Sequence, residues 1–234
     1  YIKSKELHFN ADVMRIVFLI KFFGKSDVIP FDMVQNMFPD KNKDYVISVG
    51  EHDIVLVKEI KPNYDMREIE KIAKTIADTL SSEFYAKVTI GIGTAVDSIK
   101  DLARSFKEAQ VAIAVGKVFD TEKNIISYEN LGIGRLIYQL PTTLCEMFLQ
   151  EVFKKGSLES LDRETLMTIQ CFFENNLNVS ETSRKLFVHR NTLVYRLEKI
   201  RKLTGLDLRE FEHAITFKVA LMVKKYLTSK PVKV

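Results

Sequence analysis

The 234-residue sequence predicts an α+β protein in which a mixed α/β region is followed by an all-helical region. Up to about residue 130, runs rich in β-branched and aromatic residues alternate with segments of helical periodicity. Beyond that point no strand pattern remains, and apolar residues recur every three to four positions. Apolar residues make up 46% and charged residues 28%, which is typical of folded globular proteins and excludes a disordered chain.

The first region reads as strand, helix, hairpin, helix, strand, helix and strand. Its strands are predicted where apolar runs have strand length, and its helices where apolar residues recur at helical spacing. The predicted strands are 14–23, 45–49, 53–60, 88–96 and 124–128. The predicted helices are a short one around 33–37, then 66–84 and 102–116. Ser98 and Asp101 have the spacing of a capping box before the last helix.

The second region reads as helices throughout. Apolar residues recur every four positions from Leu136 to Val152, which predicts a helix. We expect it to bend at Pro141, because proline cannot donate a backbone hydrogen bond. Residues 156–160 resemble a linker, and four helices are then predicted at 163–175, 181–187, 190–203 and 209–227. Residues 163–227 contain 12 Lys and Arg against 7 Asp and Glu, whereas the rest of the chain has a net charge of −1. The basic excess therefore lies in these helices.

Composition also limits the setting and the chemistry of the protein. No apolar run approaches the ~20 residues needed to cross a bilayer, and no secretion signal opens the sequence, so we expect no membrane partner. Cys145 and Cys171 lie in apolar helical contexts without metal spacing, which predicts core thiols in a reduced, cytoplasmic protein. The chain begins at Tyr1 rather than Met, which predicts a fragment or a trimmed chain.

We expect no catalytic residue, no metal and no cofactor. The four histidines are not spaced as metal ligands or as members of a catalytic site. They are His8, His52, His189 and His213. Gly91 and Gly93 lie within a predicted strand and lack the third glycine of a dinucleotide-binding fingerprint.

Residues 180–204 carry the strongest functional pattern. Ser180 can cap a short helix, a tight turn follows at Val188 and His189, and a second helix begins near Arg190. On the second helix, apolar side chains at 193, 197 and 200 share one face, and polar side chains point away from it. The candidate DNA-binding residues are Ser180, His189, Arg190, Asn191, Thr192, Tyr195, Arg196 and Lys199.

These residue types suit DNA recognition. Arg can bond O6 and N7 of guanine, Asn can bond N6 and N7 of adenine, and hydroxyl groups reach phosphates or base edges. Lys199 would add affinity that does not depend on sequence, and His189 is expected to contact a phosphate or to cap the helix. The alternative is an ordinary solvated basic face, with Tyr195 in the core and Arg196 paired with a carboxylate such as Glu198 or Asp207.

The segment FVHRNTLVYRLEKIRKLTGLDL, preceded by ETLMTIQCFFENNLNVSETSRKL, resembles the C-terminal Fis-like helix-turn-helix of the CdaR/PucR family of bacterial transcription regulators. The family hallmark is a nearly identical His-Arg-Asn-Thr-Leu followed by Tyr-Arg-Leu, and the resemblance covers about residues 131–225. Ser183 departs from the family, which usually has Ala at this position.

This resemblance implies that the protein regulates transcription by binding a double-stranded DNA operator. A homodimer is expected, because one recognition helix covers only about a half-site. The resemblance further implies control of the uptake or catabolism of a small metabolite. The small-molecule effector is expected to bind an N-terminal domain that is absent from this chain.

Residues 14–128 resemble the GGDEF domain of diguanylate cyclases, through the hairpin VGEHDIVLV, the strand VTIGIGTA and the segment DLARSFKEAQVAIAVGKVFDTEKNIISY. In active cyclases the hairpin tip reads Gly-Gly-Asp-Glu-Phe, and carboxylates there and after the first strand hold two Mg²⁺ ions. In this sequence Glu51 and His52 replace the second Gly and the Asp, and residues 14–25 contain no carboxylate.

The comparison implies a degenerate, non-catalytic GGDEF-like domain over residues 1–130. A connecting helix and linker are expected at 131–160 and the helix-turn-helix domain at 161–228. The alternative is a nucleotide-sensing or diguanylate-cyclase-like signalling protein whose terminal helices serve as a dimerisation module.

Overall fold

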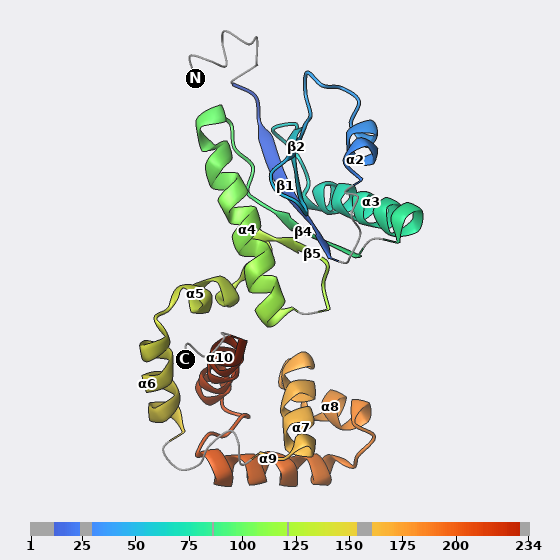
Figure 1. The fold of residues 1–234 in the computed structure, drawn as a ribbon. Coiled ribbons are helices and arrows are strands. Elements are labelled where there is room, and N and C mark those ends of the chain that lie inside the picture. Colours follow the sequence, from blue (N-terminus) through green and yellow to red (C-terminus); the bar gives the residue numbers. More distant parts are fainter. Residues whose placement is uncertain (1–11, 24–29, 86, 121, 154–160, 230–234) are drawn as a thin grey trace. The chain divides into compact units, whose positions relative to one another are not determined.

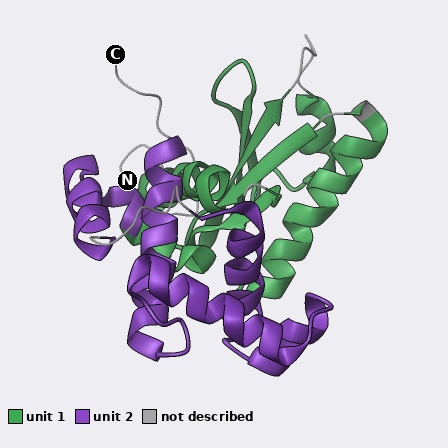
Figure 2. Cartoon of the chain, turned by 90° about the horizontal axis from the view of Figure 1, so that it is seen from below, with its two compact units in different colours: residues 1–136 green, residues 137–234 purple. Residues whose placement is uncertain are grey.

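The computed structural model describes residues 12–23, 30–85, 87–120, 122–153 and 161–229. The chain divides into two compact units, Tyr1–Leu136 and Ile137–Val234 (Figure 2). Unit 1 contains a five-stranded sheet with helices, and every regular element described in unit 2 is a helix. The predicted α+β class is therefore confirmed.

The sheet of unit 1 has the strand order β2-β3-β1-β4-β5. Its neighbouring strands are antiparallel except for β4 and β5, which are parallel. The strands are β1 (Arg15–Phe23), β2 (Tyr45–Ser48), β3 (Asp53–Glu59), β4 (Lys87–Ile92) and β5 (Ile125–Ser127). Each lies where the sequence predicts a strand, although β4 ends four residues before Val96, which forms only an isolated bridge with Arg15.

Strand β1 lies at the centre of the sheet because its side chains are apolar on both faces. Ile16 and Phe18 pack in a core with α2 (Phe31–Met37) and α3 (Met66–Phe84) on one face. Val17 and Leu19 pack on the other face against α4 (Leu102–Phe119). Figure 1 shows these helices covering the two faces of the sheet.

Helix α4 approaches β4 closely because Gly91 and Gly93 have no side chains. A Cβ at Gly91 would lie 2.2 Å from the carbonyl oxygen of Ala109, and one at Gly93 would lie 2.1 Å from that of Ser105. Any larger residue would therefore push the helix away from the sheet. These glycines serve helix–sheet packing.

Two predicted helix boundaries are wrong in detail. Ser98 accepts a hydrogen bond from the Lys100 N–H in a short 3-10 helix, η1 (Ile99–Asp101), so it does not cap α4. The rhythm across Pro141 corresponds to two helices, α5 (Ile133–Gln139) and α6 (Thr142–Val152), rather than to one bent helix. Proline lacks the N–H that would continue the ladder of hydrogen bonds.

Unit 2 contains α6 and four further helices. They are α7 (Arg163–Glu174), α8 (Val179–Lys185), α9 (Arg190–Thr204) and α10 (Phe211–Ser229). Helix α10 packs against α6, and α9 contacts both α7 and α8 (Figure 1). Among the described helices, none combines the length and the apolar character that a membrane span requires. The predicted linker at 156–160 lies outside the described residues.

Candidate nucleic-acid interface

The start of α8 is fixed by Asn178, not by Ser180 as the sequence predicts. The Asn178 side-chain oxygen accepts hydrogen bonds from the N–H groups of Ser180 and Glu181, at 2.9 and 3.0 Å. Asparagine in an extended backbone conformation satisfies two otherwise unpaired N–H groups at the helix start. Ser180 therefore lies inside the first turn, where its side chain is exposed.

Helix α9 begins at Arg190, as predicted, and His189 caps it. The Nδ1 atom of His189 accepts a hydrogen bond from the Asn191 N–H at 3.2 Å. Because Nδ1 accepts, the ring proton of the neutral imidazole lies on Nε2, and the side chain is exposed. His189 thus caps the helix and keeps one donor available to a phosphate.

One face of α9 is buried in the core of unit 2. Leu193, Leu197 and Ile200 are fully buried, and they pack in one cluster with Ile169 and Phe172 of α7. The apolar face predicted for this helix is confirmed. Because that face is fixed, the directions of the remaining α9 side chains are fixed too.

The opposite face of α9 presents polar side chains that are available for a ligand. Arg190, Asn191, Thr192 and Tyr195 are exposed, and because Tyr195 is 72% exposed, the alternative that placed it in the core is wrong. Within the described part of the chain, none of these four side chains forms a hydrogen bond or an ion pair.

Arg196 instead joins α9 to α7. Its guanidinium donates hydrogen bonds to the carboxylate of Glu164 and, at 3.3 Å, to the Thr168 hydroxyl. The side chain is only 22% exposed. Pairing with a carboxylate was one alternative for Arg196, but its partner is Glu164 rather than Glu198 or Asp207.

Lys199 forms a second connection between the two helices. Its ammonium lies 2.9 Å from the carboxylate of Asp162, which also caps α7 by accepting the Thr165 N–H at 2.7 Å. Hydrogen bonds from Thr165 and Lys199 hold the pKa of Asp162 well below its usual range. The pair is therefore charged at neutral pH, and Lys199 is less available to DNA than its sequence position predicts.

Phe187 is a surface residue that the sequence interpretation missed. It lies in the turn between α8 and α9, its φ is +53°, and its side chain is 95% exposed. A left-handed backbone is costly for a non-glycine residue, and an exposed aromatic ring gains nothing from the core. The turn places Phe187 two residues before the cap of α9, at the end where recognition helices meet base edges. In the sequence, Phe187 falls at the end of the helix predicted over 181–187, just before the turn predicted at Val188 and His189, so its exposure was not predicted.

An ion pair joins strands β1 and β3 beside the tip of the β2–β3 hairpin of unit 1. Asp53 lies opposite Lys21 in the β1–β3 register, and its carboxylate is 2.7 Å from the Lys21 ammonium. Glu51 and His52 are exposed at the tip. Among the residues that the structure describes, no group of three or more His, Cys, Asp and Glu side chains could hold a metal ion.

Two family models match separate parts of the chain. The model described as the PucR C-terminal helix-turn-helix domain matches residues 165–223, which include α8 and α9. The model described as the GGDEF-like domain matches residues 3–115. The two matches therefore follow the division of the chain into two units.

Several curated proteins are similar over most of this chain. The purine catabolism regulatory protein of Bacillus subtilis (strain 168) is 27% identical over 64% of this chain and 28% of its own length. The carbohydrate diacid regulator of Escherichia coli (strain K12) is 27% identical over 79% of this chain and 49% of its own length. The proline-responsive transcriptional activator PutR of B. subtilis (strain 168) is 25% identical over 77% of this chain and 46% of its own length. The chain thus spans between about a quarter and a half of the length of these relatives.

Proposed function

The chain belongs to the CdaR/PucR family of bacterial transcription regulators, and from this premise we propose that it binds double-stranded DNA sequence-specifically through α9. One observation carries the proposal. The α9 face opposite the core presents Arg190, Asn191, Thr192 and Tyr195, whose side chains form no hydrogen bond or ion pair among the described residues. A helix that packs in the core with one face and exposes hydrogen-bonding side chains on the other is suited to bind in a groove of DNA.

The dimensions and charges of α9 support binding in the major groove. A helix of 15 residues is about 22 Å long, and the major groove is about 12 Å wide, enough to admit a helix. Asn191 at the N-terminal end is suited to bond adenine, and Arg190 to bond guanine or a phosphate. The partial positive charge of the helix N-terminus, with the Nε2–H of His189, favours a phosphate nearby.

A homodimer and a metabolite effector complete the proposal. A single recognition helix per chain reads about half of an operator, so two copies are needed for a full site. Relatives named for purine catabolism, carbohydrate diacids and proline support a role in controlling the uptake or catabolism of a small metabolite. The GGDEF-like domain is proposed to be non-catalytic, because the Lys21 ammonium already neutralises Asp53 at the hairpin.

The test is fluorescence anisotropy of labelled DNA fragments, including the region upstream of the protein's own gene, at two salt concentrations. We expect saturable binding that prefers certain sequences and weakens steeply with salt, because phosphate contacts release counterions. Asn191→Ala should reduce discrimination between preferred and scrambled DNA by about 1–3 kcal/mol without lowering the melting temperature.

Gln150→Ala is the matched control, because Gln150 is also an exposed amide but lies on α6. It should leave DNA affinity unchanged. Binding that is weak and indifferent to sequence, or equal discrimination by Asn191→Ala and the parent, would contradict the proposal.

A further inference from the structure

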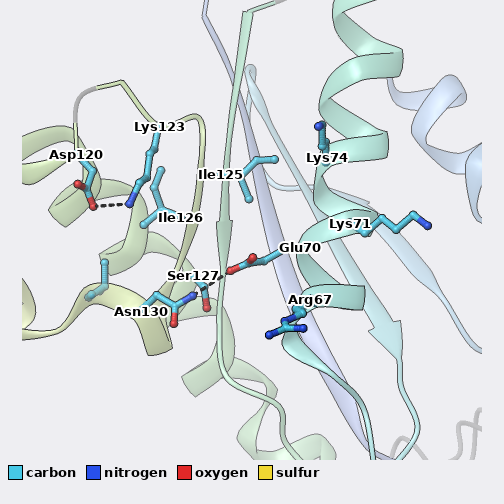
Figure 3. Close-up of a pocket in the computed structure, with 11 residues that line it drawn as sticks. Arg67, Glu70, Lys71, Lys74, Asp120, Lys123, Ile125, Ile126, Ser127 and Asn130 are labelled. Atoms are coloured by element: carbon cyan, nitrogen blue, oxygen red, sulfur yellow. Dashed lines mark hydrogen bonds and ion pairs between the residues drawn. The ribbon is translucent and has the colours of Figure 1, made fainter.

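A cavity of about 430 Å³ opens in unit 1 beside the edge strand β5 (Figure 3). It lies between α3 on one side and the segment around Asp120 and Lys123 on the other. Strand β5 and the 3-10 helix η2 (Tyr128–Leu131) supply the rest of its lining. In the strand order β5 is at the opposite edge from β2, so the cavity is separate from the β2–β3 hairpin.

The lining of this cavity carries an excess of positive charge. Arg67, Lys71 and Lys74 of α3 line it, and within the described residues their charged groups have no hydrogen bond or ion pair. Figure 3 shows Arg67 extending toward β5, whereas the Lys71 ammonium points away from the strand.

The carboxylates of the cavity are already engaged. Glu70 accepts a hydrogen bond from the Asn130 side-chain amide at 2.9 Å, and Asp120 lies 3.4 Å from Lys123. Four cationic side chains and these two carboxylates line the cavity, and because the Lys71 ammonium points away from β5, the remaining groups have a formal charge of +1. An anion is therefore the ligand that the cavity favours.

Ser127 gives a second and independent indication of a ligand. It lies on β5, lines the cavity and is only 5% exposed. Its hydroxyl has no hydrogen-bond partner among the described groups. Buried polar groups in folded proteins are nearly always hydrogen-bonded, so a buried hydroxyl without a partner beside a cavity indicates a group supplied from outside.

We propose that this cavity binds a small phosphate monoester. A phosphate group is attracted by the positive lining, and the forked guanidinium of Arg67 can bond two of its oxygens at once. The Ser127 hydroxyl can donate to a third oxygen, and Ile125 and Ile126 offer an apolar surface to the organic part of the ligand. The volume lies within the range of small-molecule sites, about 300–1,000 Å³.

The position of the site gives the ligand a regulatory consequence, which rests on the DNA binding proposed above. The hydrogen bond from Asn130 to Glu70 joins η2 to α3, and η2 is followed directly by α5 at the end of unit 1. A phosphate that bonds groups on both sides of the cavity acts on the segment that leads to unit 2. Coupling between two sites is reciprocal, so DNA should change phosphate affinity by the factor by which phosphate changes DNA affinity.

The test is isothermal titration calorimetry of the full chain with phenyl phosphate, and with phenol and inorganic phosphate for comparison. We expect one phenyl phosphate per chain, no binding of phenol and weaker binding of inorganic phosphate. Arg67→Gln should weaken phenyl phosphate binding by about tenfold or more, because it removes a charge-assisted pair of hydrogen bonds. Lys107→Gln, which removes an exposed cation of α4 outside the cavity, should have no effect.

Ser127→Ala separates ligand binding from folding. Because the hydroxyl has no partner among the described residues, its removal should leave the melting temperature unchanged or raise it, while phenyl phosphate binding weakens. Phenol bound as tightly as phenyl phosphate, equal affinities of Arg67→Gln and the parent, or no binding at millimolar phenyl phosphate would each overturn the site. Phosphate binding without any change in DNA affinity would overturn only the regulatory consequence.

Discussion

Two arginines of α9 have different roles because they differ in burial and in their partners. Arg190 is exposed and, among the described residues, has no partner, whereas Arg196 is 22% exposed and bonds Glu164 and Thr168. The first is available to DNA. The second holds α9 against α7, so any part it plays in DNA binding includes the positioning of the recognition helix.

Substitutions on the two sides of this ion pair separate its roles. Glu164→Gln should lower the free energy of unfolding by up to about 1 kcal/mol, because it removes one partially exposed ion pair, and DNA affinity should not fall. Arg196→Ala should lower the free energy of unfolding further, because Thr168 also loses a donor. Urea denaturation and DNA anisotropy measure the two effects. Unchanged stability in both variants, with DNA binding lost only in Arg196→Ala, would assign Arg196 to DNA alone.

Phe187 has both a strained, left-handed backbone and an exposed aromatic ring. Phe187→Gly should relieve the left-handed backbone and raise the free energy of unfolding by up to about 1 kcal/mol. DNA affinity should fall, because a ring at this end of α9 can contact thymine methyl groups or sugars. Phe187→Ala serves as the control that removes the ring and keeps the strain. If both variants bound DNA as tightly as the parent, the ring would have no part in the interface.

At the scale of the element, the helix-turn-helix depends on how its helices begin. Asn178, Asp162 and His189 each accept a backbone N–H at the start of α8, α7 and α9 respectively. These caps set where each helix begins, whereas the buried face of α9 sets which of its side chains face outward.

Capping at Asn178 gives a prediction that distinguishes it from Ser180. Asn178→Ala should lower the free energy of unfolding by about 1 kcal/mol, because two N–H groups lose their acceptor. Ser180→Ala should change it by less than about 0.5 kcal/mol, since its side chain is exposed in the first turn. Thermal unfolding of both variants measures the difference. If Ser180→Ala lowered the free energy of unfolding more than Asn178→Ala, Ser180 would be the residue that caps α8.

At the scale of the whole molecule, the proposed DNA binding uses α9 of each chain, so a two-fold operator would take two chains. We expect two chains per duplex on an operator whose half-sites lie about 34 Å apart, one helical turn of DNA, or a multiple of it. Sedimentation velocity of the complex gives the stoichiometry. Adding about five base pairs between half-sites should weaken binding, because it places them on opposite faces of the duplex. One chain per duplex, with no dependence on spacing, would contradict the dimer.

The sequence by itself determined the features that depend on local periodicity. The apolar residues of 14–23 predicted strand β1, and the spacing of Leu193, Leu197 and Ile200 predicted the buried face of α9. Replacement of the hairpin glycine and aspartate by Glu51 and His52 was also readable directly. In each case the feature depends on residues that are close together in the chain, so the local sequence pattern is enough to predict it. The assignment of individual α9 residues to DNA contacts stays a prediction.

Tertiary structure alone decided which groups meet across long stretches of sequence. Arg196 finds Glu164 on another helix, Lys21 finds Asp53 on another strand, and Ser127 comes to line a cavity with Arg67. The left-handed backbone at Phe187, between α8 and α9, was likewise seen only in the structure. Local propensity says which face of an element is buried, but the partner of a charge or a hydroxyl depends on which elements pack together. That choice belongs to the folded chain as a whole.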